Sequence, residues 1–194
     1  MSLTGERQTS QHPAGSGLHG PAAVLPYARP ASPKAAPASI RLDEDSLLSL
    51  GRLFGSSCVT PWSERGHGAL DARDYELLEL SDHFEVWVIH WPSDGLLQLH
   101  DHGGSSGALY VVSGSLDEGT VSAANTHERR SIGAGQGTSF GPRHVHDVVN
   151  PGPGVATSVH VYSPPMEKMT FFTLRAGGLV PDHTEYRADP TWAP

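Results

Sequence analysis

Residues 96–114 read LLQLHDHGGSSGALYVVSG, and this stretch decides the fold. Two runs rich in apolar and β-branched residues flank a turn of glycine and serine, a pattern typical of β-strands. His100 and His102 lie two residues apart at the end of the first run. Side chains at this spacing point to the same face of an extended strand. We therefore expect two imidazoles to converge inside an all-β domain.

Short β-rich runs continue from residue 75 onward, separated by Gly, Pro, Ser, Asn and Asp. The predicted strands are 75–80, 83–91, 95–100, 108–114, 115–124, 127–132, 137–140, 144–150, 155–163 and 169–174. No helical pattern between them is long enough for a crossover between parallel strands. The count and spacing predict an antiparallel sandwich or barrel, and a double-sheet jelly roll fits both.

The residues before the strands divide into two parts. The segment LDEDSLLSLGRLF at 42–54 predicts one short helix, with Leu47, Leu50 and Phe54 as its apolar stripe and Gly55 near its end. Residues 1–40 are rich in Pro, Ala, Gly and Ser, and they contain too little apolar area to offset the entropy of ordering. We expect a disordered tail at 1–40 and one folded domain at 41–194.

Composition excludes several classes of protein. A formal net charge of −8 argues against a nucleic-acid surface, and the adjacent Arg129 and Arg130 are expected in a solvated hairpin. No apolar run reaches signal-peptide or membrane-spanning length, so we expect a cytoplasmic protein without membrane contact. The sequence does not fix the oligomeric state, and a monomer is our expectation. Cys58 is the only cysteine, which excludes a disulfide or a Cys-based metal site within one chain; we expect it to be partly buried.

Twelve histidines stand out, and a second His-x-His pair lies downstream of the first. In GPRHVHDVVN at 141–150, His144 and His146 have the same spacing, and either could add a third ligand to His100 and His102. Three neutral imidazoles suit a divalent first-row metal and leave coordination positions open. Zinc also uses three histidines, so the spacing alone does not choose the metal.

A third motif, SVHVYSPP at 158–165, places Ser158, His160 and Tyr162 at alternate positions of one strand. Their side chains therefore face the same side and can pass hydrogen bonds to the phenol. Two interpretations stay open. The row can simply satisfy the hydroxyl of a core tyrosine, or it can act as a relay that positions Tyr162 over a metal and its ligands.

Together these motifs resemble the cysteine dioxygenase family of thiol dioxygenases, which are cupins. The resemblance covers about residues 75–175. The matching pieces are His100-Asp-His102 followed by Gly114, His146 with Asn150 four residues on, and the segment from Ser158 to Pro165. Each His-x-His pair is weakly specific, whereas the ordered set ending in HVYSPP is strongly so. The resemblance implies a cupin double-stranded β-helix, or jelly-roll barrel, with a short N-terminal helix.

The resemblance also implies an activity. His100, His102 and His146 are then the ligands of Fe(II), and Ser158, His160 and Tyr162 are the relay beside it. A small thiol, L-cysteine first, reacts with O2 to form a sulfinic acid. Another thiol such as 3-mercaptopropionate is the alternative substrate. Two other functions stay open: a cupin that binds a metal or small molecule without chemistry, and a zinc or nickel cupin with isomerase or hydrolase activity.

The chain departs from the family pattern at two positions. The mammalian members carry a cysteine crosslinked to the tyrosine where this chain has Gly107, as in the bacterial branch, so Tyr162 is expected to stay an unmodified phenol. The arginine that binds the substrate carboxylate in the family falls at Leu77 when the strand 83–91 is aligned. Leucine cannot pair with a carboxylate. The candidate substitutes are Arg73, Arg143 and Arg175.

Two other histidines are expected to lie outside the ligand set. His144 falls outside the family's ligand position, so we expect it beside the site or at the surface. His90 alternates with apolar residues and is expected to be a hydrogen-bonded histidine of the sheet.

Overall fold

The structure is a computed structural model that describes residues 40–64, 69–189, 192 and 194. The backbone divides into residues 1–36 and 37–194, and the described residues all belong to the second unit. The tail predicted at 1–40 lies outside the described residues except for Ile40. Neither helix in the described part of the chain is long and apolar enough to cross a membrane.

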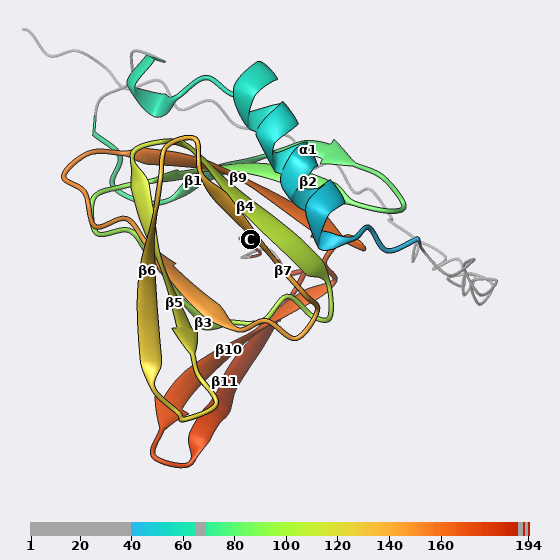
Figure 1. The fold of residues 1–194 in the computed structure, drawn as a ribbon, viewed down its shortest axis with the longest axis vertical. Helices are drawn as coiled ribbons and strands as arrows, with labels where there is room; N and C mark the ends of the chain where they lie inside the picture. The colour runs from blue at the N-terminus through green and yellow to red at the C-terminus, as the bar shows by residue number, and fades with distance from the viewer. Residues whose placement is uncertain (1–39, 65–68, 190–191, 193) are drawn as a thin grey trace, which may run out of the picture. The chain divides into compact units, whose positions relative to one another are not determined.

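Eleven strands form two antiparallel sheets in the described residues. The five-stranded sheet has the order β1-β2-β9-β4-β7, and the six-stranded sheet has the order β11-β10-β3-β8-β5-β6 (Figure 1). The strands are β1 (Asp74–Leu80), β2 (Glu85–Trp91), β3 (Leu96–His100), β4 (Ser106–Ser113), β5 (Ser115–Val121), β6 (His127–Gly133), β7 (Gly137–Phe140), β8 (His146–Val149), β9 (Ala156–Ser163), β10 (Lys168–Arg175) and β11 (Gly178–Tyr186). This arrangement confirms the predicted all-β cupin jelly roll.

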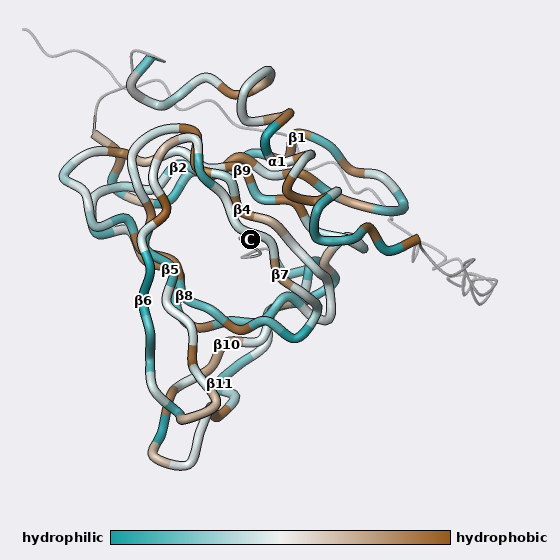
Figure 2. Tube along the Cα trace, in the orientation of Figure 1, coloured by the Kyte–Doolittle hydropathy of each residue, from teal (hydrophilic) through white to brown (hydrophobic). Residues whose placement is uncertain are grey.

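The main core lies between the two sheets. Trp87, Ile89 and Trp91 alternate along β2 and turn their side chains inward, where they join Leu97 and Val148 from the other sheet. Burial of these apolar side chains is the main favourable contribution to folding. Strand β6, at the sheet edge, is hydrophilic along most of its length (Figure 2), and its side chains are mostly exposed. A charged edge of this kind discourages pairing with other chains.

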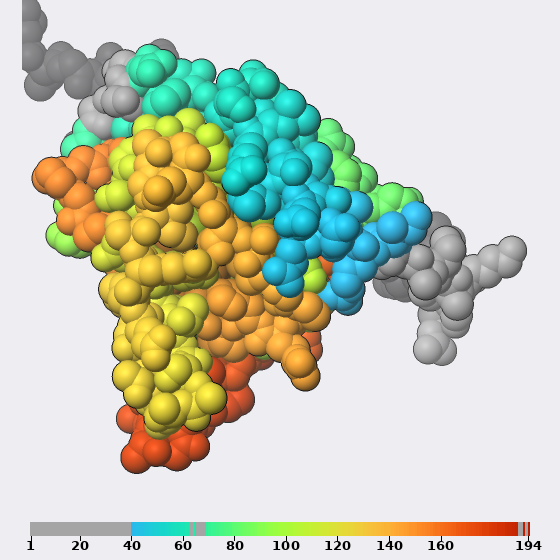
Figure 3. All heavy atoms as spheres, viewed as in Figure 1, coloured from blue at the N-terminus to red at the C-terminus, as the bar shows by residue number. Residues whose placement is uncertain are grey.

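Helix α1 (Glu44–Ser57) packs on the outer face of the five-stranded sheet (Figures 1 and 3). Asp43 caps it, because its side chain accepts a hydrogen bond from the amide of Ser46 at 2.8 Å. The helix continues past the predicted end at Gly55. A Cβ atom at Gly55 would lie 2.6 Å from the ring of Tyr110, so this glycine allows close packing on β4 instead of ending the helix. A short 3-10 helix, η1 (Trp62–Glu64), follows.

The structure differs from the sequence analysis at two places. Strand β11 was not predicted, because Pro181 and several charged residues interrupt its pattern. The strand forms at the edge of the sheet, where β10 shifts its register between Phe171 and Phe172 opposite the proline. Cys58 is exposed at the end of α1, whereas partial burial was expected.

Candidate metal centre

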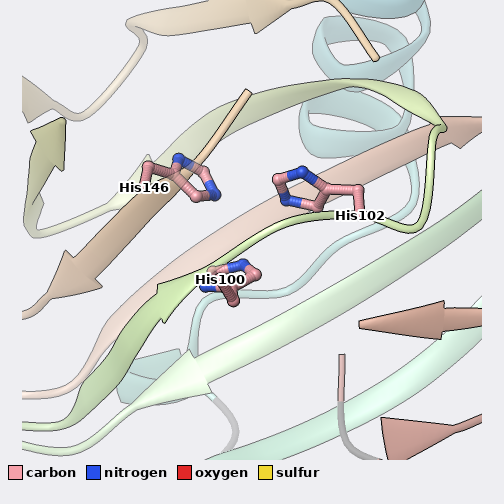
Figure 4. A group of neighbouring side chains, drawn as sticks. All are labelled: His100, His102 and His146. Carbon is pink, nitrogen blue, oxygen red and sulfur yellow. The ribbon is translucent and has the colours of Figure 1, made fainter. Parts of the chain in front are cut away.

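Three histidines meet between the sheets, and we call them the histidine triad: His100, His102 and His146. His100 ends β3 and His146 begins β8, and the two residues are directly paired in the sheet. The centroids of the three rings lie 4.8 to 5.0 Å apart, and the three side chains point toward a common space (Figure 4). Each residue is 1% exposed. One nitrogen from each ring lies within 4.8 Å of the others, which suits a shared metal ion.

His102 reaches the triad from a turn rather than from a strand, because β3 ends at His100. Asp101 fixes this turn: its carboxylate accepts hydrogen bonds from the amides of Gly103 and Thr170, both at 3.0 Å. Gly103 has a φ of +61°, and a Cβ there would lie 2.5 Å from the main-chain oxygen of Lys168. The prediction that the two imidazoles converge is therefore correct, but strand alternation is only part of the cause.

The hydrogen bonds of the triad leave nitrogens for a metal. His100 donates from Nδ1 to the main-chain oxygen of Gln98 at 2.7 Å, and His146 donates from Nδ1 to Glu118 at 2.8 Å. Each therefore keeps Nε2 for another ligand. Both ring nitrogens of His102 are buried without a hydrogen-bond partner in the described residues. Burial lowers the pKa of all three imidazoles and keeps them in the neutral form that binds metals. The residues fit a divalent cation.

Glu118 on β5 supports the triad, and the sequence reasoning missed it. The same oxygen of its fully buried carboxylate accepts hydrogen bonds from His146 and, at 2.9 Å, from His144. Arg130 donates to the other oxygen at 2.7 Å, so this arginine does more than cover a solvated hairpin. Burial would raise the pKa of Glu118, but these hydrogen bonds outweigh it and lower the pKa. Glu118 lies two residues after the core residue Leu116. Side chains two residues apart in a strand face the same side, so this spacing could have predicted that the Glu118 carboxylate points inward.

His144 does not belong to the triad. Its ring stacks on Phe140 with the centroids 4.6 Å apart, and Phe140 in turn stacks on His102 at 4.6 Å. These stacking contacts, together with the hydrogen bond to Glu118, place His144 beside the site.

His90 lies away from the triad in β2, where its Nδ1 and the hydroxyl of Thr157 form a hydrogen bond of 3.0 Å. Both placements match the expectations from sequence.

A chain of hydrogen bonds, which we call the relay, leads to the triad along β9. The hydroxyl of Ser158 lies 3.0 Å from Nε2 of His160, and Nδ1 of His160 lies 3.1 Å from the hydroxyl of Tyr162. All three residues are buried. The ring of Tyr162 stacks on His102 with the centroids 5.3 Å apart, so the relay ends beside the triad. Trp91, whose role was not predicted, donates from its indole to Ser158 at 2.8 Å.

The environment keeps both aromatic members of the relay uncharged. Burial lowers the pKa of His160 to about 3, helped by the positive charge of Arg73. Burial raises the pKa of Tyr162 well above its usual value, helped by the charge of Glu85. At neutral pH the relay therefore consists of a neutral imidazole and a protonated phenol.

Gly107 faces Tyr162 across the β4–β9 pairing. A Cβ atom at Gly107 would lie 2.5 Å from the ring of Phe140 and 2.9 Å from the ring of Tyr162. Phe140 thus fills the space that a longer side chain would need. Cys58, at the exposed end of α1, is on a different element. The arrangement agrees with an unmodified phenol at Tyr162.

Arg73 is the candidate arginine nearest to the site. Its guanidinium carbon lies 5.4 Å from the centre of the Trp91 ring, and its charge contributes to the pKa shifts of His100 and Tyr162. Arg143 and Arg175 are exposed in a turn and at the end of β10.

Leu77, where the alignment placed the carboxylate-binding position, is 37% exposed on the edge strand β1. Strand β1 shifts its register between Leu77 and Glu79, and counting along the chain cannot detect such a shift. Of the three candidate substitutes, Arg73 precedes the same strand and lies beside Trp91.

Comparisons with known proteins place these features in a family. Solved structures with similar folds include a double-stranded β-helix protein from Klebsiella pneumoniae (17% identity, TM-score 0.46, covering 66% of this chain and 98% of that chain). KdgF from a Halomonas species has 15% identity and a TM-score of 0.44, covering 53% of this chain and 91% of its own. The family model described as cysteine dioxygenase type I matches residues 45–175, which include the triad and the relay. The chain therefore belongs to the cysteine dioxygenase type I family.

Proposed function

We propose that this protein is an iron-dependent thiol dioxygenase that converts a small thiol bearing a carboxylate into a sulfinic acid. L-cysteine is the first candidate substrate, and 3-mercaptopropionate is the alternative. The observation that carries the proposal is the contact between the relay and the triad: Tyr162 stacks on His102, whose two buried nitrogens have no partner in the described residues. A protein that only stores a metal has no need of a phenol held at this position.

His100, His102 and His146 would hold the Fe(II) ion. Three protein ligands leave coordination positions for a thiol and for dioxygen. When bound, the ion would lower the pKa of the thiol and hold the two reactants at contact distance. Neutral imidazoles suit this role, and burial keeps the triad neutral.

In the proposed arrangement the relay runs from Trp91 toward Tyr162. The indole of Trp91 can only donate, so the hydroxyl oxygen of Ser158 accepts. If the hydroxyl of Ser158 donates to Nε2 of His160, the neutral imidazole carries its proton on Nδ1 and donates to the oxygen of Tyr162. The phenol proton is then free to form a hydrogen bond with a group beside the triad. Tyr162 thus acts as an oriented neutral donor.

Arg73 supplies the positive charge for the substrate carboxylate. The planar guanidinium can bind a carboxylate through two parallel hydrogen bonds while its face lies near the Trp91 ring. Because Trp91 also donates to Ser158, one side chain connects the acid-binding end of the site with the relay. This arrangement favours cysteine and 3-mercaptopropionate over cysteamine, which has no carboxylate.

Oxygen uptake tests the proposal. Protein loaded anaerobically with Fe(II) is offered cysteine, 3-mercaptopropionate, cysteamine or no thiol, and the sulfinate product is quantified. We expect uptake matched by sulfinate for at least one of the two acidic thiols and little for cysteamine. If iron-loaded protein consumes no oxygen with any thiol, the dioxygenase proposal fails and a metal-binding cupin without this chemistry is favoured.

A further inference from the structure

A polar surface cavity of about 360 Å³ lies between α1, β6 and β7, and we call it the arginine cavity. Helix α1 and strand β7 lie side by side (Figures 1 and 3). A Cβ atom at Gly137 would lie 2.8 Å from the side chain of Leu48, so this glycine lets the helix approach the strand closely. Arg52 follows Leu48 by four residues and is therefore on the same side of the helix. This packing brings Arg52 to the cavity.

The residues around the arginine cavity suit a negatively charged ligand. Its side chains come from Arg52, Arg130, Ser131, Gln136 and Thr138, with Ile132 as the apolar member. No acidic residue of the described chain lines it, although the protein carries a formal net charge of −8. Guanidinium groups match the oxygens of phosphate and sulfate in geometry as well as in charge. Hydroxyl and amide groups beside them can supply further hydrogen bonds.

Both guanidinium groups have donors available for a ligand. Arg52 is exposed and forms no ion pair with any described residue. Arg130 donates from Nε and Nη2 to Glu118, and from Nη2 also to the hydroxyl of Thr138. Its Nη1 has no hydrogen-bond partner among the described residues. Arg130 is thus held in one orientation, and less conformational freedom is lost when it binds an anion.

Arg130 also connects the arginine cavity to the histidine triad. It donates to one oxygen of Glu118 at 2.7 Å, and the other oxygen accepts from His146 at 2.8 Å. An anion bound at Nη1 would share the positive charge of Arg130 with Glu118. The Glu118 carboxylate would then accept more strongly from His146, which makes that imidazole a better metal ligand. The added negative charge also favours a cation at the triad.

We propose that the arginine cavity binds a sulfate or phosphate group, free or carried on a small molecule, and that this binding tightens metal binding at the histidine triad. Arg52 and Nη1 of Arg130 hold the oxyanion, and Glu118 transmits its effect to His146. The coupling is reciprocal, so a metal at the triad tightens binding of the anion by the same factor. This inference goes beyond the proposed function, because it involves neither a thiol nor dioxygen.

Arg52→Gln tests the site, because it removes one charge of the cavity and leaves the contacts of Glu118 unaltered. Arg175→Gln is the matched control, since this arginine is exposed at the end of β10 and does not line the cavity. Anaerobic calorimetry measures the Kd of inorganic sulfate and of glycerol 3-phosphate for the Fe(II)-loaded proteins. Sodium chloride holds the ionic strength constant, so that screening is the same in every titration.

We expect Arg52→Gln to weaken binding of both anions about tenfold or more, the usual effect of losing one charge-assisted hydrogen bond. Arg175→Gln should stay within about twofold of the unaltered protein. Tighter binding of glycerol 3-phosphate than of sulfate would identify a phosphate ester as the ligand, and equal binding would identify the free ion. If the unaltered protein binds neither anion, or if both variants bind equally well, the inference is overturned.

Competition with a chelator tests the coupling by measuring the Kd for Fe(II) with and without saturating sulfate. We expect sulfate to tighten Fe(II) binding about fivefold in the unaltered protein and to have no effect in Arg52→Gln. Unchanged or weaker Fe(II) binding in the presence of bound sulfate would contradict the path through Arg130 and Glu118. Because neither measurement uses a thiol, a protein that oxidises no thiol would end the proposed function and leave this test intact.

Discussion

Single residues determine what the site can bind. His102 is the clearest case, because its two buried nitrogens lack partners in the described residues while its ring stacks on both Phe140 and Tyr162. His100 and His146 each use Nδ1 for a hydrogen bond, so Nε2 is the nitrogen that each has left for a metal. The clustering of these histidines could be predicted from the sequence, because a His-x-His spacing is visible without a structure. Glu118 was harder to find, because one acidic residue in a strand has no such signature.

Removing the charge of Glu118 should weaken metal binding. In Glu118→Gln the side chain no longer polarises His146, and Arg130 loses its ion pair. Partners of metal-binding histidines typically contribute roughly 10–100-fold to metal affinity, and we expect a loss of that size. Competition with a chelator measures the Kd for Fe(II). Glu128→Gln, on the exposed part of β6, is the control and should bind normally. Normal affinity in both variants would contradict this role.

Tyr162→Phe should keep the metal and slow turnover. The ring still stacks on His102, but the hydroxyl that ends the relay is gone. Loss of one hydrogen bond to a charged group typically costs about 1.5–3 kcal/mol, so we expect kcat to fall by about tenfold or more. Oxygen uptake and sulfinate formation should be measured together to detect uncoupling. Unchanged kcat with full coupling would show that the phenol plays no part in the reaction.

At the scale of elements, close packing explains where prediction from sequence succeeded and failed. The helix was predicted from its apolar stripe and its cap, but its end depends on how Gly55 packs against Tyr110 across the sheet. Strand β11 has Pro181 in its interior and was missed, since a strand at a sheet edge can accommodate a proline that its local sequence argues against.

Gly55→Ala should destabilise the protein even though alanine favours helices. In an open helix this change stabilises by about 0.5–1 kcal/mol. Here the new methyl group would lie 2.6 Å from the Tyr110 ring, and overpacking typically costs about 1–3 kcal/mol. Chemical denaturation should show a net loss. Gly51→Ala is the control, because its Cβ would lie 3.3 Å from Tyr110. A more stable Gly55→Ala protein would contradict the packing described.

At the scale of the whole molecule, the site exists only when both sheets have formed. His100 and His146 come from the six-stranded sheet, whereas Tyr162 and Trp91 come from the five-stranded sheet. The motifs therefore predicted which histidines meet and which residues form the hydrogen-bonded row on β9, but neither Trp91 beside Ser158 nor Arg73 beside Trp91 could be read from spacing. Those contacts depend on strands that are distant in the sequence.

A metal that binds only the folded protein should raise its thermal stability. At a free Fe(II) concentration of about 100 times the Kd, the gain is roughly 2.7 kcal/mol. For a domain of this size that corresponds to an increase in Tm of about 5–10 °C. Anaerobic thermal denaturation with and without Fe(II) measures it. His146→Ala should lose the increase, whereas His83→Ala, an exposed residue, should keep it. An equal increase in both variants would place the metal elsewhere.

The most direct test of the central claim is the origin of the oxygen atoms in the product. Fe(II)-loaded protein is incubated with cysteine or 3-mercaptopropionate under 18O2, and the sulfinate is analysed by mass spectrometry. The proposed function predicts that both sulfinate oxygens carry the label and that His146→Ala forms no product. Sulfinate with one labelled oxygen or none, or equal product from His146→Ala, would contradict a dioxygenase that acts at the histidine triad.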